Sequence, residues 1–392
     1  MEHLLPACSF VYWCAMAGLV HRVCARVPRL RDLEADPPKA WPSVSVVVPA
    51  RDEADTLVPA LRSKLALPYP RLEVVLVDDR STDATPRLAR ELAATHPRLS
   101  VVRVDQLPSG WVGKVHAMHR GVEHASGEWL LFCDADVHIA ADTLQRIVAY
   151  AERERLDHVA MLPRITATEP PLVCTLGTFL RQLCVGGRLG DVADPRSSAA
   201  AGIGAFNLVR RRAFERISGF APLRTAINDD VALGRLLKRS GARSCVVNGC
   251  TGLALEFFPS FQAMTRSLEK NGGTVSPLVL WLGLAVLLVL EAGFLTGFAS
   301  GSPWLAALAV ATWSLAAAVT LRFLRWLALP RWPALVPFLG MLPLAWALAR
   351  AGGLAWLRGG VVWRGTFYPR GELPPLPAAS PSAAPPMREA SP

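Results

Sequence analysis

Two aspartates lie at the end of an apolar run, where their side chains could bind a divalent metal ion. The run is Trp-Leu-Leu-Phe-Cys at 129–133, and Asp134 and Asp136 follow it. Because residues two apart in an extended chain point the same way, we expect both carboxylates at the carboxyl end of a buried strand. Open α/β sheets bind ligands at this edge, and paired carboxylates suit a cation that holds a phosphate-bearing substrate. The same triplet also occurs in ordinary solvated turns. Other residues of the chain must therefore decide between a metal site and such a turn.

Acidic residues also follow two upstream strands that the sequence predicts. They are Asp52 and Glu53, which come with Arg51 after the strand at 43–49, and Asp78, Asp79 and Asp83 after the strand at 72–77. Loops are often acidic, but three strands that end alike favour a shared site at one sheet edge. A carboxylate of the second strand would accept the imino proton of a uracil ring. Asp136 would bind the metal, which offsets charge on a departing diphosphate, and Asp134 the ribose or the metal.

Strands and helices alternate through the first half of the chain. Apolar β-branched runs predict further strands at 99–104 and 128–133, and helices are expected at 55–67, 82–95 and 114–125. This order predicts a mostly parallel sheet that is covered on both faces and binds nucleotide at its carboxyl edge. No Gly-x-Gly-x-x-Gly follows the first strand, which disfavours a dinucleotide-binding oxidoreductase.

The alternation weakens after Pro163. An apolar stretch at 172–185 is expected at the surface of the domain, followed by a strand near 203–209 and a helix at 229–239. We expect this half of the domain to bind the acceptor.

The composition indicates a soluble domain joined to membrane segments. Of 392 residues, 52% are hydrophobic and 19% are charged, and the mean hydropathy is +0.29. Windows long enough to cross a bilayer occur at 4–20, 278–298 and 304–321. A fourth, at 334–357, is broken by prolines and followed by arginines, which favours a re-entrant or interfacial segment.

The first window is expected to be an uncleaved anchor rather than a signal peptide. No basic stretch precedes it, and four arginines between 22 and 31 follow it. Their position also predicts a cytoplasmic catalytic domain. The expected divisions are an N-terminal anchor at 1–30, a soluble domain at 43–271, a C-terminal membrane region at 277–364 and a disordered tail at 371–392.

The net charge of +10 favours anionic lipid rather than nucleic acid as a partner, because no zinc-finger, helix-turn-helix or RNA-binding motif accompanies it. The eight cysteines show no metal-ligand spacing and are expected to be reduced cytosolic residues.

Three acidic segments together resemble the family 2 glycosyltransferases of the GT-A fold. They are Val-Val-Val-Pro-Ala-Arg-Asp-Glu (46–53), Val-Asp-Asp-Arg-Ser-Thr-Asp (77–83) and Asp-Ala-Asp (134–136), within a match over about 43–271. The resemblance implies a Rossmann-like α/β domain that binds a nucleotide sugar, with transmembrane helices at the N-terminal and C-terminal ends of the chain. It assigns donor binding to Pro49, Arg51, Glu53, Asp79 and Asp134, and Mg²⁺ or Mn²⁺ binding to Asp136.

The segment Leu-Pro-Ser-Gly-Trp-Val-Gly-Lys (107–114) is similar to one in hopene-associated and carotenoid glycosyltransferases. Cellulose synthases carry a nucleotide-contacting lysine at this place, which implies that Lys114 faces the diphosphate. A lysine at the start of a helix after a glycine-bearing loop can meet phosphate together with free backbone N–H groups. The alternative is a solvated lysine in the first helical turn.

The family's Glu-Asp motif is matched by Asp229 and Asp230, and the resemblance gives Asp230 the role of catalytic base. An acceptor hydroxyl needs such a base because it is a poor nucleophile until its proton is taken. Asp at 229 departs from the usual Glu, which puts any role of the longer side chain in doubt. Both carboxylates would also favour the positive end of a helix without any catalytic role.

Processive family members carry Gln-x-x-Arg-Trp after this helix, and the corresponding segment, 261–271, lacks it. A single sugar transfer is therefore expected. Arg266 and Lys270 lie one helical turn apart and are either diphosphate contacts or juxtamembrane cations attracted to lipid.

Together these features predict a multi-pass protein of the cell membrane with its catalytic domain in the cytoplasm. It would be an inverting, non-processive enzyme that moves a sugar from a nucleotide sugar, expected to be a UDP-sugar, to a hydroxyl of a lipid or lipid-linked acceptor. Two other classes stay open: a metal-dependent nucleotidyltransferase or phosphotransferase, and a catalytically inactive membrane scaffold.

Overall fold

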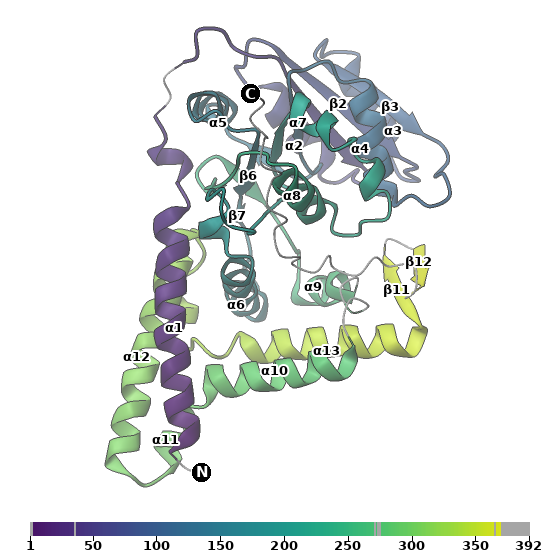
Figure 1. Ribbon diagram of the computed structural model, residues 1–392. Helices are drawn as coiled ribbons and strands as arrows, with labels where there is room; N and C mark the ends of the chain where they lie inside the picture. The colour runs from purple at the N-terminus through teal and green to yellow at the C-terminus, as the bar shows by residue number, and fades with distance from the viewer. Residues whose placement is uncertain (1–2, 35–36, 270–271, 273–275, 364–365, 370–392) are drawn as a thin grey trace, which may run out of the picture.

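The computed structural model describes residues 3–34, 37–269, 272, 276–363 and 366–369. Figure 1 shows an α/β domain joined to a group of long helices, two of which run away from the domain while two others lie across its underside. The predicted disordered tail at 371–392 lies outside the described residues.

A seven-stranded mixed sheet forms the centre of the α/β domain. Its order is β3-β2-β1-β4-β8-β6-β9. The strands are β1 (Val44–Ala50), β2 (Leu72–Asp79), β3 (Leu99–Val104), β4 (Trp129–Phe132), β6 (His158–Leu162), β8 (Asn207–Arg210) and β9 (Ser244–Asn248). Strand β8 is antiparallel to both β4 and β6, and the other neighbours are parallel. The sheet is therefore more mixed than the mostly parallel one that the sequence predicts.

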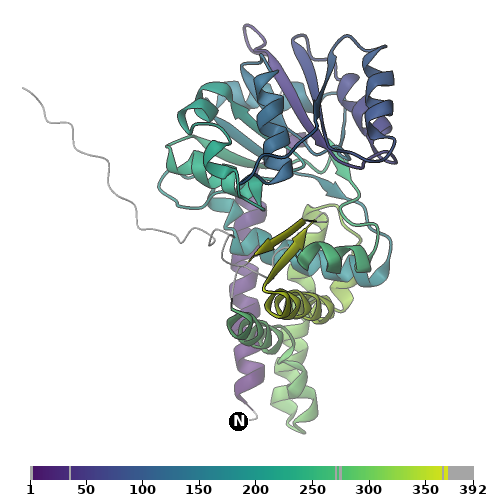
Figure 2. The same cartoon turned by 90° about the vertical axis from the view of Figure 1, so that its right-hand side faces the viewer.

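Helices cover both faces of this sheet, as expected. Val46 and Val48 of β1 share one core with the helices on one face, whereas Val47 packs with those on the other, which is the alternation of a strand buried on both sides. The helices are α2 (Leu57–Leu65), α3 (Thr85–Ala93) and α5 (Thr143–Arg153) on the first face, and α4 (Gly113–Glu123), α7 (Arg211–Arg216) and α8 (Asp229–Arg239) on the second. Figure 2 shows the same layers from the side.

A smaller sheet and several short elements complete the fold. The sheet joins β5 (His138–Ile139), β10 (Leu253–Leu255) and β7 (Arg164–Ile165). The remaining short elements are η1 (Leu30–Asp32), η2 (Leu189–Asp191), η3 (Ala221–Leu223), η5 (Trp332–Leu335), and the hairpin β11 (Gly360–Trp363) and β12 (Thr366–Pro369).

Two helices are long and apolar enough to cross a membrane. They are α1 (Leu4–Arg26) and α12 (Pro303–Trp326), and Figures 1 and 2 show them side by side. The window expected at 278–298 is not one span. It is divided into α10 (Pro277–Ala292), of 16 residues, and the short α11 (Leu295–Ala299).

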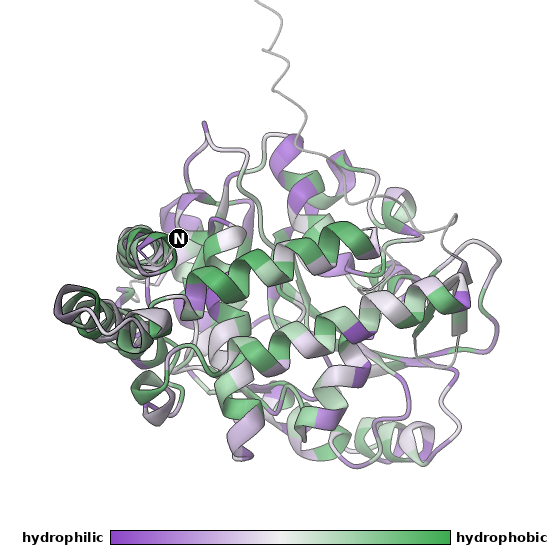
Figure 3. Ribbon diagram, turned by 90° about the horizontal axis from the view of Figure 1, so that it is seen from below, coloured by the Kyte–Doolittle hydropathy of each residue, from purple (hydrophilic) through white to green (hydrophobic). Residues whose placement is uncertain are grey.

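Helix α10 lies beside α13 (Met341–Arg358) across the underside of the domain. Seen from below, these two helices present mainly apolar residues (Figure 3). Their exposed side chains include Leu278, Leu282, Trp346 and Trp356. Helix α13 covers most of the window at 334–357, and its re-entrant or interfacial place in a membrane stays a prediction.

The apolar stretch at 172–185 forms α6 (Pro170–Gly186), and most of it is buried rather than at the surface. Leu172, Leu176, Leu180 and Cys184 pack in the same core as residues of α1, α12 and α13. These helices cover most of α6, and Leu183 remains exposed. Helix α9 (Phe261–Leu268) packs against α13 as well as α6.

Candidate active site

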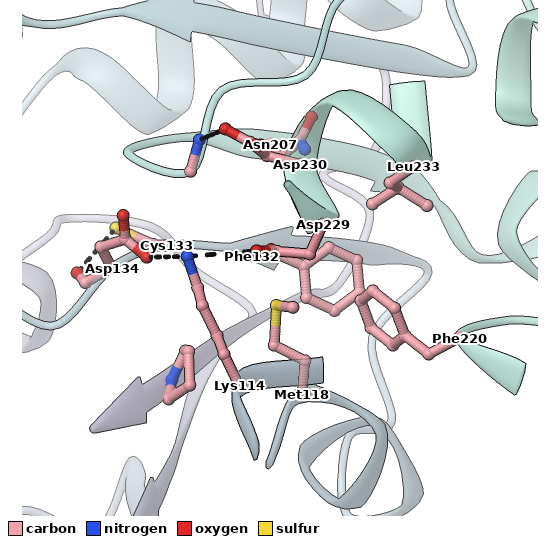
Figure 4. A pocket seen from close by; sticks show the side chains of 12 residues that line it. Lys114, Met118, Phe132, Cys133, Asp134, Asn207, Phe220, Asp229, Asp230 and Leu233 are labelled. Atoms are coloured by element: carbon pink, nitrogen blue, oxygen red, sulfur yellow. Dashed lines mark hydrogen bonds and ion pairs between the residues drawn. The ribbon is translucent and has the colours of Figure 1, made fainter. Parts of the chain in front are cut away.

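A pocket opens at the carboxyl end of β1 and β4, beside the starts of α4 and α8 (Figure 4). Its polar lining comes from separate parts of the chain, and apolar side chains form the rest of the wall. The lining residues are Pro49, Lys114, Met118, Phe132, Cys133, Asp134, Gly204, Asn207, Phe220, Asp229, Asp230 and Leu233. The sheet topology brings them together, because parallel strands end at one edge.

Lys114 joins two of the carboxylates. Its Nζ lies 2.6 Å from Asp134 Oδ1 and 3.7 Å from Asp229 Oδ2. Burial favours a lower pKa for Lys114, but the carboxylates of Asp134, Asp229 and Asp230 outweigh it and raise the pKa. The side chain is therefore an ammonium group at neutral pH. It stands in the first turn of α4, where backbone N–H groups are also free to meet an anion.

Asp230 lies at the start of α8, and two backbone N–H groups hold its carboxylate. Its Oδ1 accepts a hydrogen bond from Val231 N at 2.7 Å, and its Oδ2 accepts one from Gly204 N at 2.9 Å. The first contact satisfies a helix N-terminus, as the capping interpretation expects. The second ties the carboxylate to a different segment of the pocket wall, so a cap alone does not account for its position.

The segment around Gly204 joins both acidic motifs. Asp134 N donates to Gly204 O at 3.1 Å, and a Cβ at Gly204 would lie 2.8 Å from Asp134 Oδ2 and 3.3 Å from Lys114 Nζ. Two residues earlier, a Cβ at Gly202 would lie 1.7 Å from Asp230 O. A side chain at Gly204 would crowd the Asp134 carboxylate, and one at Gly202 would displace the backbone of Asp230, so glycine permits each close approach.

The two acids at the end of β2 are paired with arginines. Asp79 lies 2.8 Å from Arg80 Nε, and Asp78 lies 2.8 Å from Arg103 Nη1. A Cβ at Gly113 would be 2.6 Å from Asp79 Oδ2. Asp79 therefore packs against the residue before Lys114, next to the pocket.

Comparison with known proteins assigns this part of the chain to a family. Residues 45–218 match the family model described as Glycosyl transferase family 2. This segment forms a glycosyltransferase family 2 domain. A stretch of 111 residues is 36% identical to "Succinoglycan biosynthesis protein ExoO" of Rhizobium meliloti (strain 1021), and covers 28% of this chain and 30% of that protein. The match thus spans less than a third of the length of that relative.

One solved structure supports the GT-A fold of this glycosyltransferase domain. The mannosyltransferase PcManGT of Pyrobaculum calidifontis, solved with GDP-Man and Mn²⁺, is 23% identical with a TM-score of 0.52, over 90% of this chain and 99% of that one. TarS 1–349 of S. aureus is 14% identical with a TM-score of 0.40, over 83% of this chain and 95% of that one. Only the mannosyltransferase has a TM-score above 0.5. Because its sequence identity is 23%, the likeness concerns the fold alone.

Four of the predicted site residues of the glycosyltransferase line the pocket, and five do not. Those in the lining are Pro49, Lys114, Asp134 and Asp230; those outside it are Arg51, Glu53, Asp79, Asp136 and Arg266. Two hydrogen bonds join the loops after β1 and β2. Thr82 N donates to Asp52 Oδ1 at 2.7 Å, and Glu53 N donates to Thr85 Oγ1 at 2.8 Å. Arg266 is exposed on α9, and Lys270 lies outside the described residues.

Asp136 follows β4 on the same turn as Asp134, and its environment suits a cation. Burial and the negative charge of Asp134 raise the pKa of Asp136, which means that its ionised form gains from positive charge nearby. Among the described residues no three His, Cys, Asp or Glu side chains form a metal-binding group. One or two carboxylates nevertheless suffice for Mg²⁺ when substrate phosphates supply further oxygens. The two aspartates fit a metal shared with a diphosphate.

Sequence reasoning missed Lys64, which holds the turn that carries Asp134 and Asp136. Its fully buried Nζ donates to Val137 O at 2.5 Å and to Ala135 O at 3.4 Å. Burial lowers the pKa of this lysine. Its signal was a charged residue on the apolar face of α2, at helical spacing from Leu57 and Leu61.

His158 was also missed, and it supports the pocket residue Asn207. Its ring is fully buried, with Nε2 2.6 Å from Asn207 Oδ1 and Nδ1 3.2 Å from Ser244 Oγ. Burial lowers the pKa of His158 to about 4. The neutral ring therefore orients the amide of Asn207 in the pocket wall.

Proposed function

We propose that this glycosyltransferase moves a sugar from a nucleotide sugar, favoured to be a UDP-sugar, to a hydroxyl of a lipid or lipid-linked acceptor at the cytoplasmic face of the cell membrane. The observation that carries the proposal is one pocket in which Lys114 bridges Asp134 and Asp229 while Asp230 stands alongside. An ammonium group for a diphosphate and a carboxylate for a hydroxyl proton thus lie together. The mannosyltransferase of the same fold, solved with GDP-Man and Mn²⁺, supports a nucleotide sugar as the donor.

Lys114 acts on the donor in this proposal. Its ammonium is bound to Asp134. The diphosphate would approach this charge and the free N–H groups at the start of α4, which orient it and draw electrons toward the leaving group. A divalent cation held by Asp136 with Asp134 would offset the negative charge on the departing diphosphate.

Asp230 acts on the acceptor as general base. Its two backbone contacts fix the orientation of its carboxylate. As it takes the hydroxyl proton, the acceptor oxygen attacks the anomeric carbon in a single step, which inverts the configuration. Phe132, Phe220 and Leu233 line the same pocket and exclude water that would otherwise hydrolyse the donor.

The arrangement of the helices supports a membrane location and a lipid acceptor. Helices α1 and α12 are long enough to cross a bilayer, and the exposed apolar side chains of α10 and α13 lie beneath the catalytic domain. An amphipathic acceptor could reach the pocket from such a surface. The resemblance of 107–114 to hopene-associated and carotenoid glycosyltransferases points the same way, and the missing Gln-x-x-Arg-Trp supports a single transfer.

Membranes that contain the protein, incubated with a panel of nucleotide sugars labelled in the sugar, test the proposal. We expect label in the lipid extract, release of nucleoside diphosphate, and dependence on Mn²⁺ or Mg²⁺. A parallel incubation with donor labelled in the phosphate separates sugar transfer from phosphotransfer. Label that enters lipid from the phosphate but not from the sugar would contradict the proposal.

A further inference from the structure

A second hollow lies between the end of α1 and the end of α6, and the proposed reaction does not use it. Its volume is about 300 Å³, a size typical of small-ligand sites. Leu19, Val23 and Val185 form its apolar wall, and the rest of the lining is Arg22, Arg188, Gly190 and Asp191. The hollow therefore combines an apolar surface with two arginines and one aspartate.

Positive charge exceeds negative charge beside this hollow. Asp191 Oδ1 lies 2.7 Å from Arg22 Nη2 and 2.9 Å from Arg26 Nη1, and its Oδ2 lies 3.4 Å from Arg188 Nη2. Three guanidinium groups thus share one carboxylate, whose side chain is only 8% exposed. Those of Arg22 and Arg188 are about half exposed, at 48% and 54%. Because an arginine has five N–H donors, these contacts leave donors available to a further anion.

The backbone at Arg188 is compatible with glycine. Arg188 has φ +51° and ψ +43°, the left-handed region that glycine adopts more easily than any other residue. A glycine at this position would therefore remove the guanidinium group without backbone strain.

We propose that the hollow binds the headgroup phosphate of an anionic phospholipid, with Arg22 and Arg188 as the phosphate ligands. The inference rests on the membrane location in the proposed function and does not depend on sugar transfer. Arg22 stands in the last two turns of α1, the end of a helix long enough to cross a bilayer, where headgroups and acyl chains meet. Leu19 and Val23 would contact the start of an acyl chain while the two guanidinium groups bind the phosphate oxygens.

The test measures lipid binding by the full-length protein, purified in neutral detergent, as the shift in melting temperature on titration with short-chain phosphatidylglycerol. Phosphatidylcholine and inorganic phosphate serve as the other two ligands. The variants are Arg22→Gln and Arg188→Gly, with Arg71→Gln as a control. Arg71 is 61% exposed on the catalytic domain, so its replacement removes one positive charge away from the hollow. Arg188→Gly keeps the backbone conformation favourable, so this variant is expected to fold.

We expect phosphatidylglycerol to raise the melting temperature of the wild-type and Arg71→Gln proteins, and phosphatidylcholine to do so much less. The apparent affinity for phosphatidylglycerol should fall about tenfold or more in Arg22→Gln and Arg188→Gly, as the loss of a charge-assisted contact implies. Unchanged affinity in both variants would overturn the proposal, as would an equal effect of phosphatidylcholine. If inorganic phosphate alone reproduces the shift, the hollow is a site for soluble anions and the lipid assignment is wrong. Because no donor or metal is present, failure of sugar transfer would not affect these outcomes.

Discussion

Replacement of Asp230 by asparagine separates its chemical role from its structural one. The carboxylate accepts one hydrogen bond from Val231 N and one from Gly204 N. Asparagine has the same shape but a single acceptor oxygen, so one of the two N–H groups loses its partner. That loss should cost about 1 kcal/mol of folding free energy, since Asn and Asp serve almost equally well at a helix start.

The effect on catalysis should be far larger. An amide cannot take the acceptor proton, and general base catalysis typically contributes about 10²–10⁴-fold, or roughly 3–5 kcal/mol of barrier. We therefore expect the turnover of Asp230→Asn to fall by about that factor while donor affinity and melting temperature change little. The assay measures initial rates of transfer, calorimetric donor binding and thermal unfolding on the same preparation.

Asp142→Asn provides a matched control, because Asp142 also stands at a helix start, at α5, and is 61% exposed in a pair with Arg146. Its turnover should stay within about twofold of the wild type, as expected for a surface position. Asp230→Asn with more than a tenth of wild-type turnover would refute the role of Asp230 as general base. A melting temperature that falls steeply in Asp230→Asn alone would show that the residue is chiefly structural.

Four other outcomes follow from the same contacts. Lys114→Gln should weaken donor binding about tenfold or more, measured by calorimetry, because an ammonium contact to phosphate is lost; unchanged affinity would exclude the contact. After chelation, Mn²⁺ should restore transfer by the wild type but not by Asp136→Asn, and equal recovery would assign the metal elsewhere. The folded-state pKa of His158 is lowered from 6.5 to about 4. The stability that the neutral ring contributes is therefore present above pH 6.5. It is lost as the pH falls toward 4, by up to about 3 kcal/mol. Denaturant unfolding of His158→Asn should show a smaller loss over this range, and an identical pH slope would contradict the assignment. Gly202→Ala should lower both stability and turnover, by about 1–3 kcal/mol of overpacking in the unfolding free energy, because its Cβ would meet Asp230 O at 1.7 Å; Gly186→Ala, with nothing within 4 Å of its Cβ, should change neither.

The first half of the fold was predictable because its pattern is local. Strands β1 to β4 and helix α8 appear within two residues of the predicted ranges, since buried β-branched runs and an acidic helix start are local signals. Strands β6 and β9 were missed. Each is only five residues long, and short apolar runs do not distinguish a strand from a buried helix segment.

The antiparallel pairing of β8 also could not be predicted, because partner choice is decided by contacts far apart in sequence. Residues of β4 pair with residues about 80 positions later. The membrane window at 278–298 failed for a related reason: hydropathy reports composition, whereas the division into α10 and α11 depends on packing against α1 and α12.

At the candidate site, residue types were predictable and their partners were not. The motifs identified Lys114, Asp134 and Asp230, and the structure brings these three into one pocket. No sequence pattern indicated that Arg80 pairs with Asp79, or that Gly204 contacts both acidic motifs. Such contacts arise only when the carboxyl ends of several strands meet.

The most direct test of the central claim is a structure of the full-length protein with a nucleoside diphosphate and Mn²⁺ bound. We predict the diphosphate beside Lys114, anomalous scattering from Mn²⁺ next to Asp136, and Asp230 facing the position that the anomeric carbon would occupy. A diphosphate bound away from Lys114, or a metal site that shares no ligand with Asp134 or Asp136, would contradict the proposed site.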